Sequence, residues 1–229
     1  MTYTIIIPIY NEERTLPKLL KELEKINKNN IEVIIIDDGS NDNTKTILRN
    51  NDLFIIITNK TNKGKGASIK KGIDSASNQN IILIDGDLEI DIKDIPQLIE
   101  NYENNNRHVL TGIRWDKKSN LKININTIGN YFINSLFNIL YKTNLNDVLC
   151  CVKIIDANLI KSLDIKSNGF SIEIETMAKL VLKKEIINEI KINYNRRSTH
   201  EGKKLKISDS WGIIMVMFKL KLFKLLPPP

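Results

Sequence analysis

The chain has 229 residues, 41% hydrophobic and 27% charged, which is enough for one sizeable α/β domain with a full core. Its formal net charge of +7 suits anionic partners, but the basic residues are dispersed and only 6% of residues are aromatic, which argues against a nucleic-acid binder. The two cysteines, Cys150 and Cys151, are adjacent and match no metal-binding spacing, and no charged leader precedes the first predicted strand. We therefore expect a cytoplasmic protein that binds no nucleic acid.

Strands and helices alternate through the first half of the chain. Nearly continuous apolar runs predict strands buried on both faces. The predicted strands are Tyr3–Ile9, Ile31–Ile36, Leu53–Thr58, Ile81–Ile84 and His108–Thr111. After the first strand, Asn11 and the acidic pair Glu12-Glu13 favour a helix start, and leucines spaced three and four apart supply its inner face. Such alternation predicts a mostly parallel sheet flanked by helices.

Further helices are predicted from apolar spacing and from start signals such as Asp94 with Pro96. They cover Asn43–Arg49, a short segment after Gly66, a segment after Asp94, Ile123–Tyr141, Ala157–Leu163 and Ile172–Lys183. A last strand is expected at Ile186–Ile192. No internal repeat or Pro/Gly/Ser linker interrupts the chain, so we expect one domain over residues 1–205, followed by a distinct segment 206–229.

The segment Trp211–Leu226 is strongly apolar but contains Lys219, Lys221 and Lys224. About 20 mainly apolar residues are needed to cross a bilayer, so this segment is too short and too often interrupted to span one. As a helix, its lysines are not expected to fall on one clean face. Two interpretations stay open: an in-plane contact with an anionic membrane surface, and a terminal helix docked on the domain.

Three carboxylates follow the fourth predicted strand in the segment Asp85-Gly86-Asp87-Leu88-Glu89. A tight turn at Gly86 can gather Asp85, Asp87 and Glu89, and clustered carboxylates repel one another unless a cation neutralises them. Hard divalent ions prefer oxygen ligands and keep open positions for substrate phosphates. The pattern therefore favours a Mg²⁺ or Mn²⁺ site that binds a nucleotide diphosphate, whereas the alternative is a solvated acidic loop.

This segment is one of five that occur in a familiar order. They are Ile7-Pro8-Ile9-Tyr10-Asn11-Glu12; Asp37-Asp38-Gly39-Ser40; Asn62-Lys63-Gly64-Lys65-Gly66-Ala67; Asp85-Gly86-Asp87; and Gly169-Phe170 with Glu173 and Glu175. Together they resemble family 2 glycosyltransferases of the GT-A fold, and most of all the dolichol-phosphate mannose synthase and polyprenyl-phosphate glycosyltransferase branch. The resemblance implies an α/β GT-A domain with a mostly parallel sheet, and a metal-dependent enzyme that uses a nucleotide-sugar.

The resemblance also assigns residues to the donor pocket, at the carboxyl ends of the parallel strands, where open α/β sheets bind ligands. The expected lining is Pro8, Tyr10, Asn11, Glu12, Asp37, Asp38, Lys63, Gly64, Asp85 and Gly86, with Arg196, Arg197 and Lys203 from a basic loop. The Lys63–Gly66 loop is neither a dinucleotide fingerprint nor an ATP-binding P-loop. Asp85, Asp87 and Glu89 are the expected ligands of Mg²⁺ or Mn²⁺. Gly86 stands where the family more often has Ala, and the exchange is expected to be tolerated.

Asp87, Arg114 and Asp147 are the expected catalytic residues. By resemblance Arg114 faces a phosphate, which a guanidinium can bind with two parallel hydrogen bonds. Asp147 begins the stretch Asp147–Lys153, in which two cysteines replace the Ser and Gly of the family pattern. The cysteines are expected to be packed small residues rather than nucleophiles. The acceptor side is therefore where this chain departs most from the pattern.

The expected reaction moves a sugar from GDP-mannose or a UDP-hexose to a polyprenyl or dolichyl phosphate, with inversion at the anomeric carbon. An ionised phosphate is already a nucleophile, so alignment and neutralisation of the leaving diphosphate are expected to carry catalysis. The expected place is the cytoplasmic face of an anionic membrane. Two alternatives stay open: a hydroxyl acceptor, with Asp147 or Glu173 as the base, and an inactive relative that only binds a nucleotide-sugar.

Overall fold

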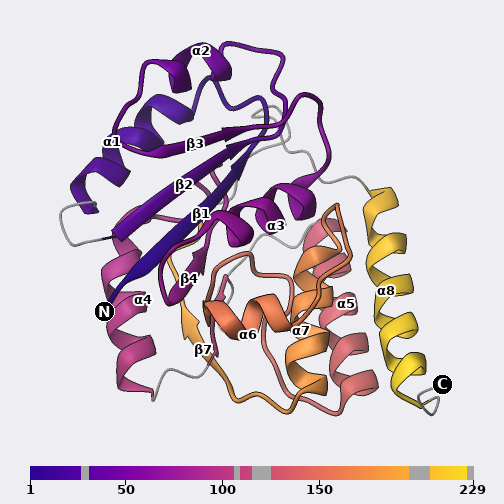
Figure 1. Ribbon diagram of the computed structural model, residues 1–229. Coiled ribbons are helices and arrows are strands. Elements are labelled where there is room, and N and C mark those ends of the chain that lie inside the picture. Colours follow the sequence, from indigo (N-terminus) through magenta and orange to yellow (C-terminus); the bar gives the residue numbers. More distant parts are fainter. Residues whose placement is uncertain (27–30, 106–108, 115–124, 196–206, 226–229) are drawn as a thin grey trace.

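The structure is a computed structural model that describes residues 1–26, 31–105, 109–114, 125–195 and 207–225 (Figure 1). Its centre is one seven-stranded sheet in the order β3-β2-β1-β4-β6-β5-β7. The strands are β1 (Tyr3–Ile9), β2 (Ile31–Asp37), β3 (Ile55–Thr58), β4 (Asn80–Leu83), β5 (Val109–Ile113), β6 (Lys153–Asp156) and β7 (Ile187–Lys191). Helices lie on both faces of the sheet, as the alternating pattern predicts.

The first four strands run parallel, with β1 between β2 and β4 and with β3 outside β2. β5 and β7 are also parallel to each other. β6 is antiparallel to both β4 and β5, and no strand is predicted there from the sequence. It is four residues long and begins with Lys153, so neither its length nor its pattern distinguishes it from a loop. The mostly parallel sheet is confirmed, and β6 is the strand that periodicity misses.

The pleat of the central strands sends alternate side chains to two separate cores. On one face Ile5, Ile7 and Ile9 belong to a core shared with helices on that side. Those helices are α1 (Leu16–Ile26), α2 (Thr44–Arg49), the short 3-10 helix η2 (Ile92–Asp94) and α4 (Ile95–Asn104). Ile6 belongs to the other core, with α3 (Lys65–Ser75), α5 (Ile125–Tyr141), α6 (Ala157–Ser162), α7 (Ile172–Leu182) and α8 (Ile207–Leu225). Burial on both faces explains the continuous apolar runs.

Helix α1 begins at Leu16 rather than at the predicted Asn11. Asn11 adopts a left-handed conformation with φ of 52°. The Glu12 carbonyl accepts main-chain hydrogen bonds from Thr15 and Leu16, and Glu12 Oε2 accepts a 2.6 Å bond from the Thr15 hydroxyl. The predicted start is wrong because the Glu12 carbonyl and the Glu12–Thr15 side-chain bond close a turn between β1 and α1, and the helix begins only after it.

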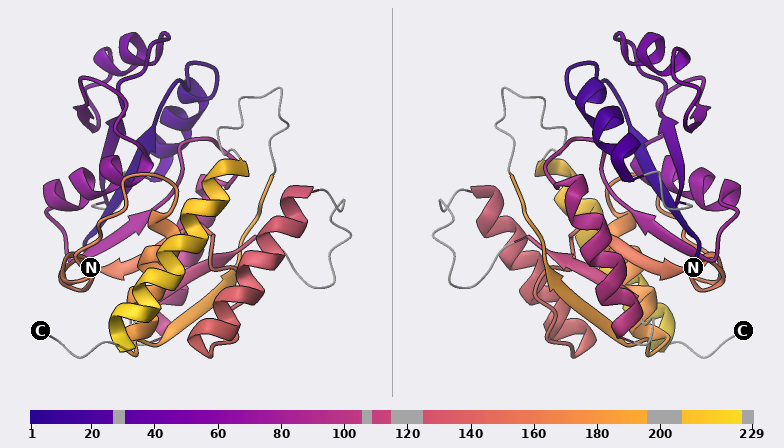
Figure 2. Two further views of the ribbon diagram at one scale, coloured as in Figure 1. Left: turned by 90° about the vertical axis from the view of Figure 1, so that its right-hand side faces the viewer. Right: turned by 90° about the vertical axis from the view of Figure 1, so that its left-hand side faces the viewer.

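Helix α8 is docked on the domain. Ile213 and Met217 are buried, and the Tyr141 hydroxyl of α5 donates a 2.8 Å hydrogen bond to the Met217 carbonyl. α8 contacts both α5 and α7, and Figure 2 shows α5 and α8 side by side on one flank. In the part of the chain that the structure describes, no helix is both long and apolar enough to cross a membrane.

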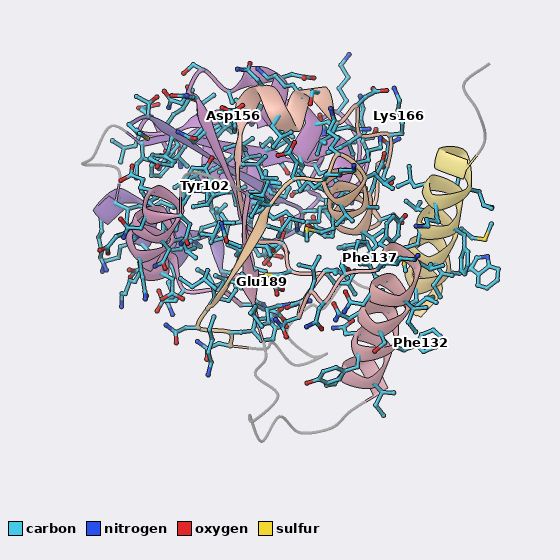
Figure 3. The ribbon with its side chains drawn as sticks, turned by 90° about the horizontal axis from the view of Figure 1, so that it is seen from below. Tyr102, Phe132, Phe137, Asp156, Lys166 and Glu189 are labelled. Atoms are coloured by element: carbon cyan, nitrogen blue, oxygen red, sulfur yellow. The ribbon has the colours of Figure 1, made fainter. Side chains whose placement is uncertain are left out.

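The outward sides of α5 and α8 expose large apolar side chains, which we call the outer apolar face. Its members are Ile128, Tyr131, Phe132 and Ile139 of α5 and Trp211, Met215, Phe218 and Leu222 of α8. Figure 3 shows that Phe132 lies at the outside of α5 while Phe137 points inward, in agreement with exposed fractions of 59% and 0%. The four residues of α8 follow at four-, three- and four-residue spacing and so share one side of the helix.

Candidate active site

The candidate site lies at the carboxyl ends of β1, β2, β3 and β4, where the following loops are bonded to one another. The Asp38 main-chain N–H, just after β2, donates to the Ile9 carbonyl at the end of β1 at 2.8 Å. Because β6 is reversed, Lys153 at its start pairs with Leu83 at the end of β4. The segments that precede β6 and follow β5 therefore reach the same edge of the sheet.

Asp38 anchors the glycine loop that follows β3. Its Oδ1 accepts hydrogen bonds from the Lys63 main-chain N–H at 2.9 Å and from the Asn59 side chain at 2.8 Å. Its Oδ2 accepts one from the Gly64 main-chain N–H at 2.7 Å. The Asp38 side chain is buried, whereas Lys63 is exposed. The carboxylate therefore fixes the backbone of the loop and leaves the Lys63 side chain at the surface.

Asp37 holds Ser40, which in turn joins the loop after β2 to the loop after β1. Its side chain is fully buried, and Oδ1 accepts a 2.9 Å hydrogen bond from the Ser40 main-chain N–H. Among the described residues, Asp37 Oδ2 has no hydrogen-bond partner. The Ser40 hydroxyl accepts a 2.8 Å bond from the Asn11 main-chain N–H, and Asn11 Oδ1 accepts a 2.7 Å bond from that of Asn41. These bonds hold the two loops together.

The other residues predicted at the end of β1 and in the loop that follows it also lie at the carboxyl edge of the sheet. Pro8 and Tyr10 are half-buried at the end of β1. Glu12 is buried, and its main-chain N–H donates a 2.9 Å bond to the Thr44 hydroxyl at the start of α2. The structure thus brings the predicted donor-binding residues of the first two loops together, although several of them are already occupied by bonds within the protein.

Asp85, the first carboxylate after β4, is paired with Lys65 at the start of α3. Lys65 Nζ lies 2.7 Å from Asp85 Oδ1, 2.9 Å from Asp85 Oδ2 and 2.8 Å from Glu173 Oε1 of α7. Glu173 Oε2 in turn lies 2.6 Å from Lys153 Nζ, which also donates to the Cys150 carbonyl. Four side chains of alternating charge therefore run inward from the site: Asp85, Lys65, Glu173 and Lys153. We call them the charge chain.

Two members of the charge chain, Glu173 and Lys65, are kept ionised by their charged partners. Burial opposes the ionised form of Glu173, but the charges of Lys153 and Lys65 lower its pKa to about 2. Burial likewise opposes the charged form of Lys65, yet Asp85 and Glu173 raise its pKa well above the ordinary value. Lys153 is fully buried in β6. A buried charge is tolerated when it is paired in this way.

The other two carboxylates after β4 have partners of their own. Asp87 Oδ1 accepts a 3.0 Å bond from the Glu89 main-chain N–H, and Glu89 Oε2 accepts a 2.8 Å bond from the Tyr194 hydroxyl. Over the residues that the structure describes, no three Asp, Glu, His or Cys side chains converge into a ready-made metal site. The assignment of Asp85, Asp87 and Glu89 as metal ligands therefore stays a prediction.

Arg114 and Asp147 meet as a bidentate pair. Arg114 Nε lies 2.8 Å from Asp147 Oδ2 and Nη2 lies 2.9 Å from Oδ1, while the Arg114 main-chain N–H donates a further 3.1 Å bond to Oδ2. Asp147 is fully buried. Burial opposes the guanidinium charge, but the Asp147 carboxylate raises the pKa of Arg114 well above its usual value. The guanidinium also lies 5.6 Å from the centre of the Tyr194 ring, so Asp147 and Tyr194 together orient it.

Two glycines of the site permit close packing. A Cβ on Gly86 would lie 2.4 Å from Ile9 Cγ2, so the buried Ile9 side chain fills the space that an alanine would need. Gly64 has a φ of 95°, and a Cβ there would lie 2.4 Å from the Asn168 carbonyl oxygen. The same carbonyl accepts a 3.0 Å bond from the Ala67 main-chain N–H. Gly64 therefore lets the glycine loop rest on the turn at Asn168.

The cysteines are packed inside the protein, as expected. Cys150 and Cys151 are both buried and free. A hydrogen bond with Cys150 and burial raise the pKa of the Cys151 thiol well above its ordinary value. Because the thiolate is the reactive form, this residue is not set up as a nucleophile.

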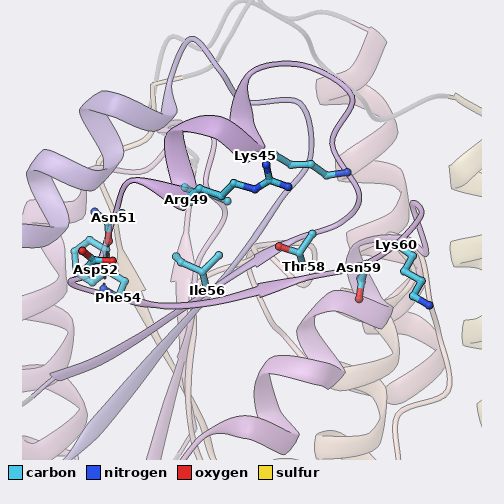
Figure 4. A pocket seen from close by; sticks show the side chains of 10 residues that line it. Lys45, Arg49, Asn51, Asp52, Phe54, Ile56, Thr58, Asn59 and Lys60 are labelled. Atoms are coloured by element: carbon cyan, nitrogen blue, oxygen red, sulfur yellow. Dashed lines mark hydrogen bonds between the residues drawn. The ribbon is translucent and has the colours of Figure 1, made fainter.

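A cavity of about 590 Å³ adjoins the Asp38 side of the site. It lies between α2 and β3, the edge strand of the sheet, and Figure 4 shows Lys45 and Arg49 on the α2 side of β3. Its lining residues are Lys45, Leu48, Arg49, Asn51, Asp52, Phe54, Ile56, Thr58, Asn59 and Lys60. Asn59 connects the cavity to the site, because it donates to Asp38. The carboxylates after β4 belong to a different part of the site.

Lys65, Lys153 and Tyr194 take part in these networks but are not among the predicted site residues. Lys65 stands between two glycines of the predicted loop, which was a usable signal. Lys153 ends the stretch that begins at the predicted catalytic residue Asp147, whereas nothing in the sequence marks Tyr194 as a partner of Glu89. Three predicted residues lie outside the described part of the chain: Arg196, Arg197 and Lys203.

Comparison with known proteins identifies the family. Residues 4–163 match the family model described as glycosyl transferase family 2. The chain belongs to this family. It is 33% identical over 180 residues to an uncharacterized protein of Methanocaldococcus jannaschii, covering 73% of this chain and 77% of that protein. It is 27% identical over 228 residues to the dodecaprenyl-phosphate galacturonate synthase of Rhizobium johnstonii, covering 96% of this chain. The chain spans 66% of that synthase, just under two thirds of its length.

A solved structure confirms the predicted fold of this chain. Glucosyl-3-phosphoglycerate synthase from Mycobacterium tuberculosis, crystallised with Mn²⁺, uridine diphosphate and phosphoglyceric acid, superposes with a TM-score of 0.76. The match covers 96% of this chain and 78% of that one at 15% sequence identity, so the likeness concerns the fold. This family 2 glycosyltransferase therefore has the predicted GT-A fold.

Proposed function

We propose that this glycosyltransferase moves a sugar from a nucleotide-sugar to a polyprenyl phosphate, with inversion at the anomeric carbon. The contacts of the two candidate bases, Asp147 and Glu173, favour a phosphate acceptor over a hydroxyl acceptor. Asp147 is fully buried with both oxygens bonded to Arg114, and Glu173 is held between two lysines with a pKa of about 2. A hydroxyl acceptor needs a base that can take its proton, whereas an ionised phosphate does not. The name of the Rhizobium relative supports the same acceptor class.

The donor is proposed to bind at the carboxyl ends of β1 to β4. Asp38 holds the Lys63 and Gly64 backbone by two short hydrogen bonds, so the exposed Lys63 side chain stands on a loop that is fixed to the carboxyl end of β2. A lysine on a fixed loop suits the diphosphate of GDP-mannose or a UDP-hexose. Arg196, Arg197 and Lys203 are proposed to add positive charge from the basic loop.

Asp85 and Asp87 fit Mg²⁺ or Mn²⁺ by the chemistry of their oxygens, and both are half-buried at the strand end. Such an ion needs only one or two carboxylates when substrate phosphates complete its coordination, so the lack of a three-carboxylate cluster among the described residues is compatible with it. Glu89 is proposed as the third oxygen ligand, held in place by the hydrogen bond from the Tyr194 hydroxyl. When bound, the ion supplies neutralisation of the leaving diphosphate.

Arg114 is proposed to face the phosphate of the acceptor or donor, with Asp147 as the residue that positions it. Both Asp147 oxygens bind the guanidinium, which fixes its plane and leaves part of its donor fork for a phosphate. This arrangement aligns the phosphate without a proton transfer, so Arg114 acts by placement and charge.

The outer apolar face is proposed to contact an anionic membrane that carries the lipid acceptor. Exposed aromatic and aliphatic side chains on α5 and α8 suit the interfacial region, and Lys219 is exposed on α8 beside them. The proposed location is the cytoplasmic face of the membrane, with the protein bound at its surface.

The proposal is tested in two steps. Calorimetry with GDP-mannose, UDP-glucose and UDP-N-acetylglucosamine, each with Mn²⁺ and with EDTA, should show metal-dependent binding of one donor. That donor is then incubated with undecaprenyl phosphate and, as the matched control, with undecaprenol. Transfer to the phosphate alone is the expected result. Binding of no donor by the folded protein, or equal transfer to the alcohol, would contradict the proposal.

A further inference from the structure

The charge chain is electrically neutral without any bound ion. It contains two carboxylates, Asp85 and Glu173, and two ammonium groups, Lys65 and Lys153, in alternation. Lys65 contacts both oxygens of Asp85 at 2.7 and 2.9 Å. The carboxylate that is proposed to hold the divalent ion is therefore already neutralised by the protein itself.

We propose that Lys65 is a built-in counter-ion that competes with the divalent cation for Asp85, so that the cation binds tightly only together with the diphosphate of the donor. This inference rests on the proposed function, because it takes Asp85 to be a metal ligand. It adds to that function that the metal and the nucleotide bind together, because Lys65 disfavours binding of the metal alone.

The packing around Lys65 allows it to leave Asp85 without losing its charge partner. Its side chain is 12% exposed, and its second contact is Glu173, 2.8 Å away. Glu173 is kept in place by Lys153, whose side chain is fully buried and also bonded to the Cys150 carbonyl. Only the contact with Asp85 has to break, and the rest of the charge chain can stay as it is.

Charge explains why the diphosphate is needed. A divalent cation that bound at Asp85 alone would place two positive charges beside the Lys65 ammonium, which repels them at short range. A donor diphosphate brings negative oxygens to the same place. Those oxygens offset the charge of the cation and also accept the ammonium hydrogens that Lys65 withdraws from Asp85.

The test measures Mn²⁺ binding directly, by the electron paramagnetic resonance signal of free Mn²⁺, with and without UDP or GDP. Lys65→Met keeps most of the side-chain volume and removes the charge. Lys65→Arg keeps the charge. Lys161→Met is the matched control, because it removes one positive charge from an exposed position on α6. Thermal unfolding of each variant confirms that it is folded.

Wild-type protein and the Lys161→Met and Lys65→Arg variants should bind Mn²⁺ weakly alone and about tenfold or more tightly with the nucleotide, within the usual range of coupling between two ligands. Lys65→Met should bind Mn²⁺ alone about tenfold more tightly than wild type, and the nucleotide should add less. Paired binding by wild type with an unchanged Lys65→Met variant would overturn the counter-ion role while leaving the proposed function intact. Absence of Mn²⁺ and nucleotide binding in every variant would overturn both.

Discussion

The donor loops and the outer apolar face solve different binding problems. Asp37 and Asp38 are buried, and their bonded oxygens accept from main-chain N–H groups or from Asn59, so the loops have little freedom. The outer apolar face is fixed only from its inner side, where residues such as Ile213 are buried, and Trp211 remains 69% exposed. A ligand of one shape is best bound by fixed polar groups, whereas a fluid lipid surface needs only apolar area and charge. Binding at the donor loops should therefore depend on the positions of individual side chains. Binding at the outer apolar face should depend on how apolar and how charged its residues are.

A site that depends on placed carboxylates should fail when one is removed. Asp87→Ala is expected to lower metal-dependent turnover by about a thousandfold, the size of effect found when a key charge-stabilising group is deleted. The protein should stay folded, because Asp87 is half-buried at a loop. Steady-state kinetics with saturating Mn²⁺ measures the effect, and Asp74→Ala, an exposed carboxylate of α3, is the control. Turnover like that of wild type would rule out Asp87 as a metal ligand.

A surface that depends on composition should respond to polarity rather than to geometry. Replacing Trp211 and Phe218 together by Glu should weaken binding to anionic liposomes at least tenfold, since an apolar side chain of this size contributes about 1.5–3 kcal/mol when buried. Both residues are exposed, so unfolding should not change. Cosedimentation measures the binding. Asn50→Glu with Asn104→Glu adds the same charge at exposed positions elsewhere, and equal loss in this control would mean that charge alone acts.

The packing under the donor loops can be tested without any ligand. Gly86→Ala should reduce the free energy of unfolding by about 1–3 kcal/mol, the usual cost of overpacking, because its Cβ meets the buried Ile9. Gly129→Ala is a matched control on α5, where a Cβ meets nothing within 4 Å. It should be neutral or stabilise the helix by up to about 1 kcal/mol. Urea denaturation decides between them, and equal values for the two variants would contradict the observed packing.

The charge chain predicts a modest dependence of stability on acid. Folding lowers the pKa of Glu173 from 4.5 to about 2, so the carboxylate stabilises the folded state above pH 4.5. That contribution is lost as the pH falls from about 4.5 toward 2, because the unfolded chain takes up the proton first. Glu173→Gln should therefore show a smaller loss of stability between pH 6 and pH 3. The free energy of unfolding is measured by denaturation at each pH. An equal loss of stability in wild type and in Glu173→Gln would refute this prediction.

Much of the fold is predictable because the central strands carry their own signal. The isoleucine runs of β1 and β2 are buried on both faces, and the structure places both strands inside the sheet, each with a neighbouring strand on either side. β6 carries no such signal: its Lys153 is buried only because Glu173, twenty residues later, neutralises it. Hydrophobic periodicity cannot predict that a charged side chain is buried when its burial depends on a neutralising residue in another helix or strand.

The candidate site also has a part that the sequence predicts and a part that it does not. Because polar residues follow the predicted strands, Asp38 and Asp85 are expected at the same edge of the sheet. The structure places both residues at that edge. Their partners are not predictable, because Asp38 binds main-chain N–H groups of a loop and Asp85 binds Lys65 from a different helix. Such contacts join residues 20 or more positions apart. They follow from how the loops fold together rather than from any local pattern.

The reversed direction of β6 has a practical consequence for engineering. It brings Lys153 to the rim of the sheet that carries the carboxylates, whereas the turn between α7 and β7 lies at the opposite rim. Lys183 and Lys184 there are exposed, and Lys184 adopts a left-handed φ of 64°, as in a helix-ending turn. A fluorescent label, an affinity tag or new chain termini from circular permutation can be introduced at this turn, far from the edge where substrates are proposed to meet.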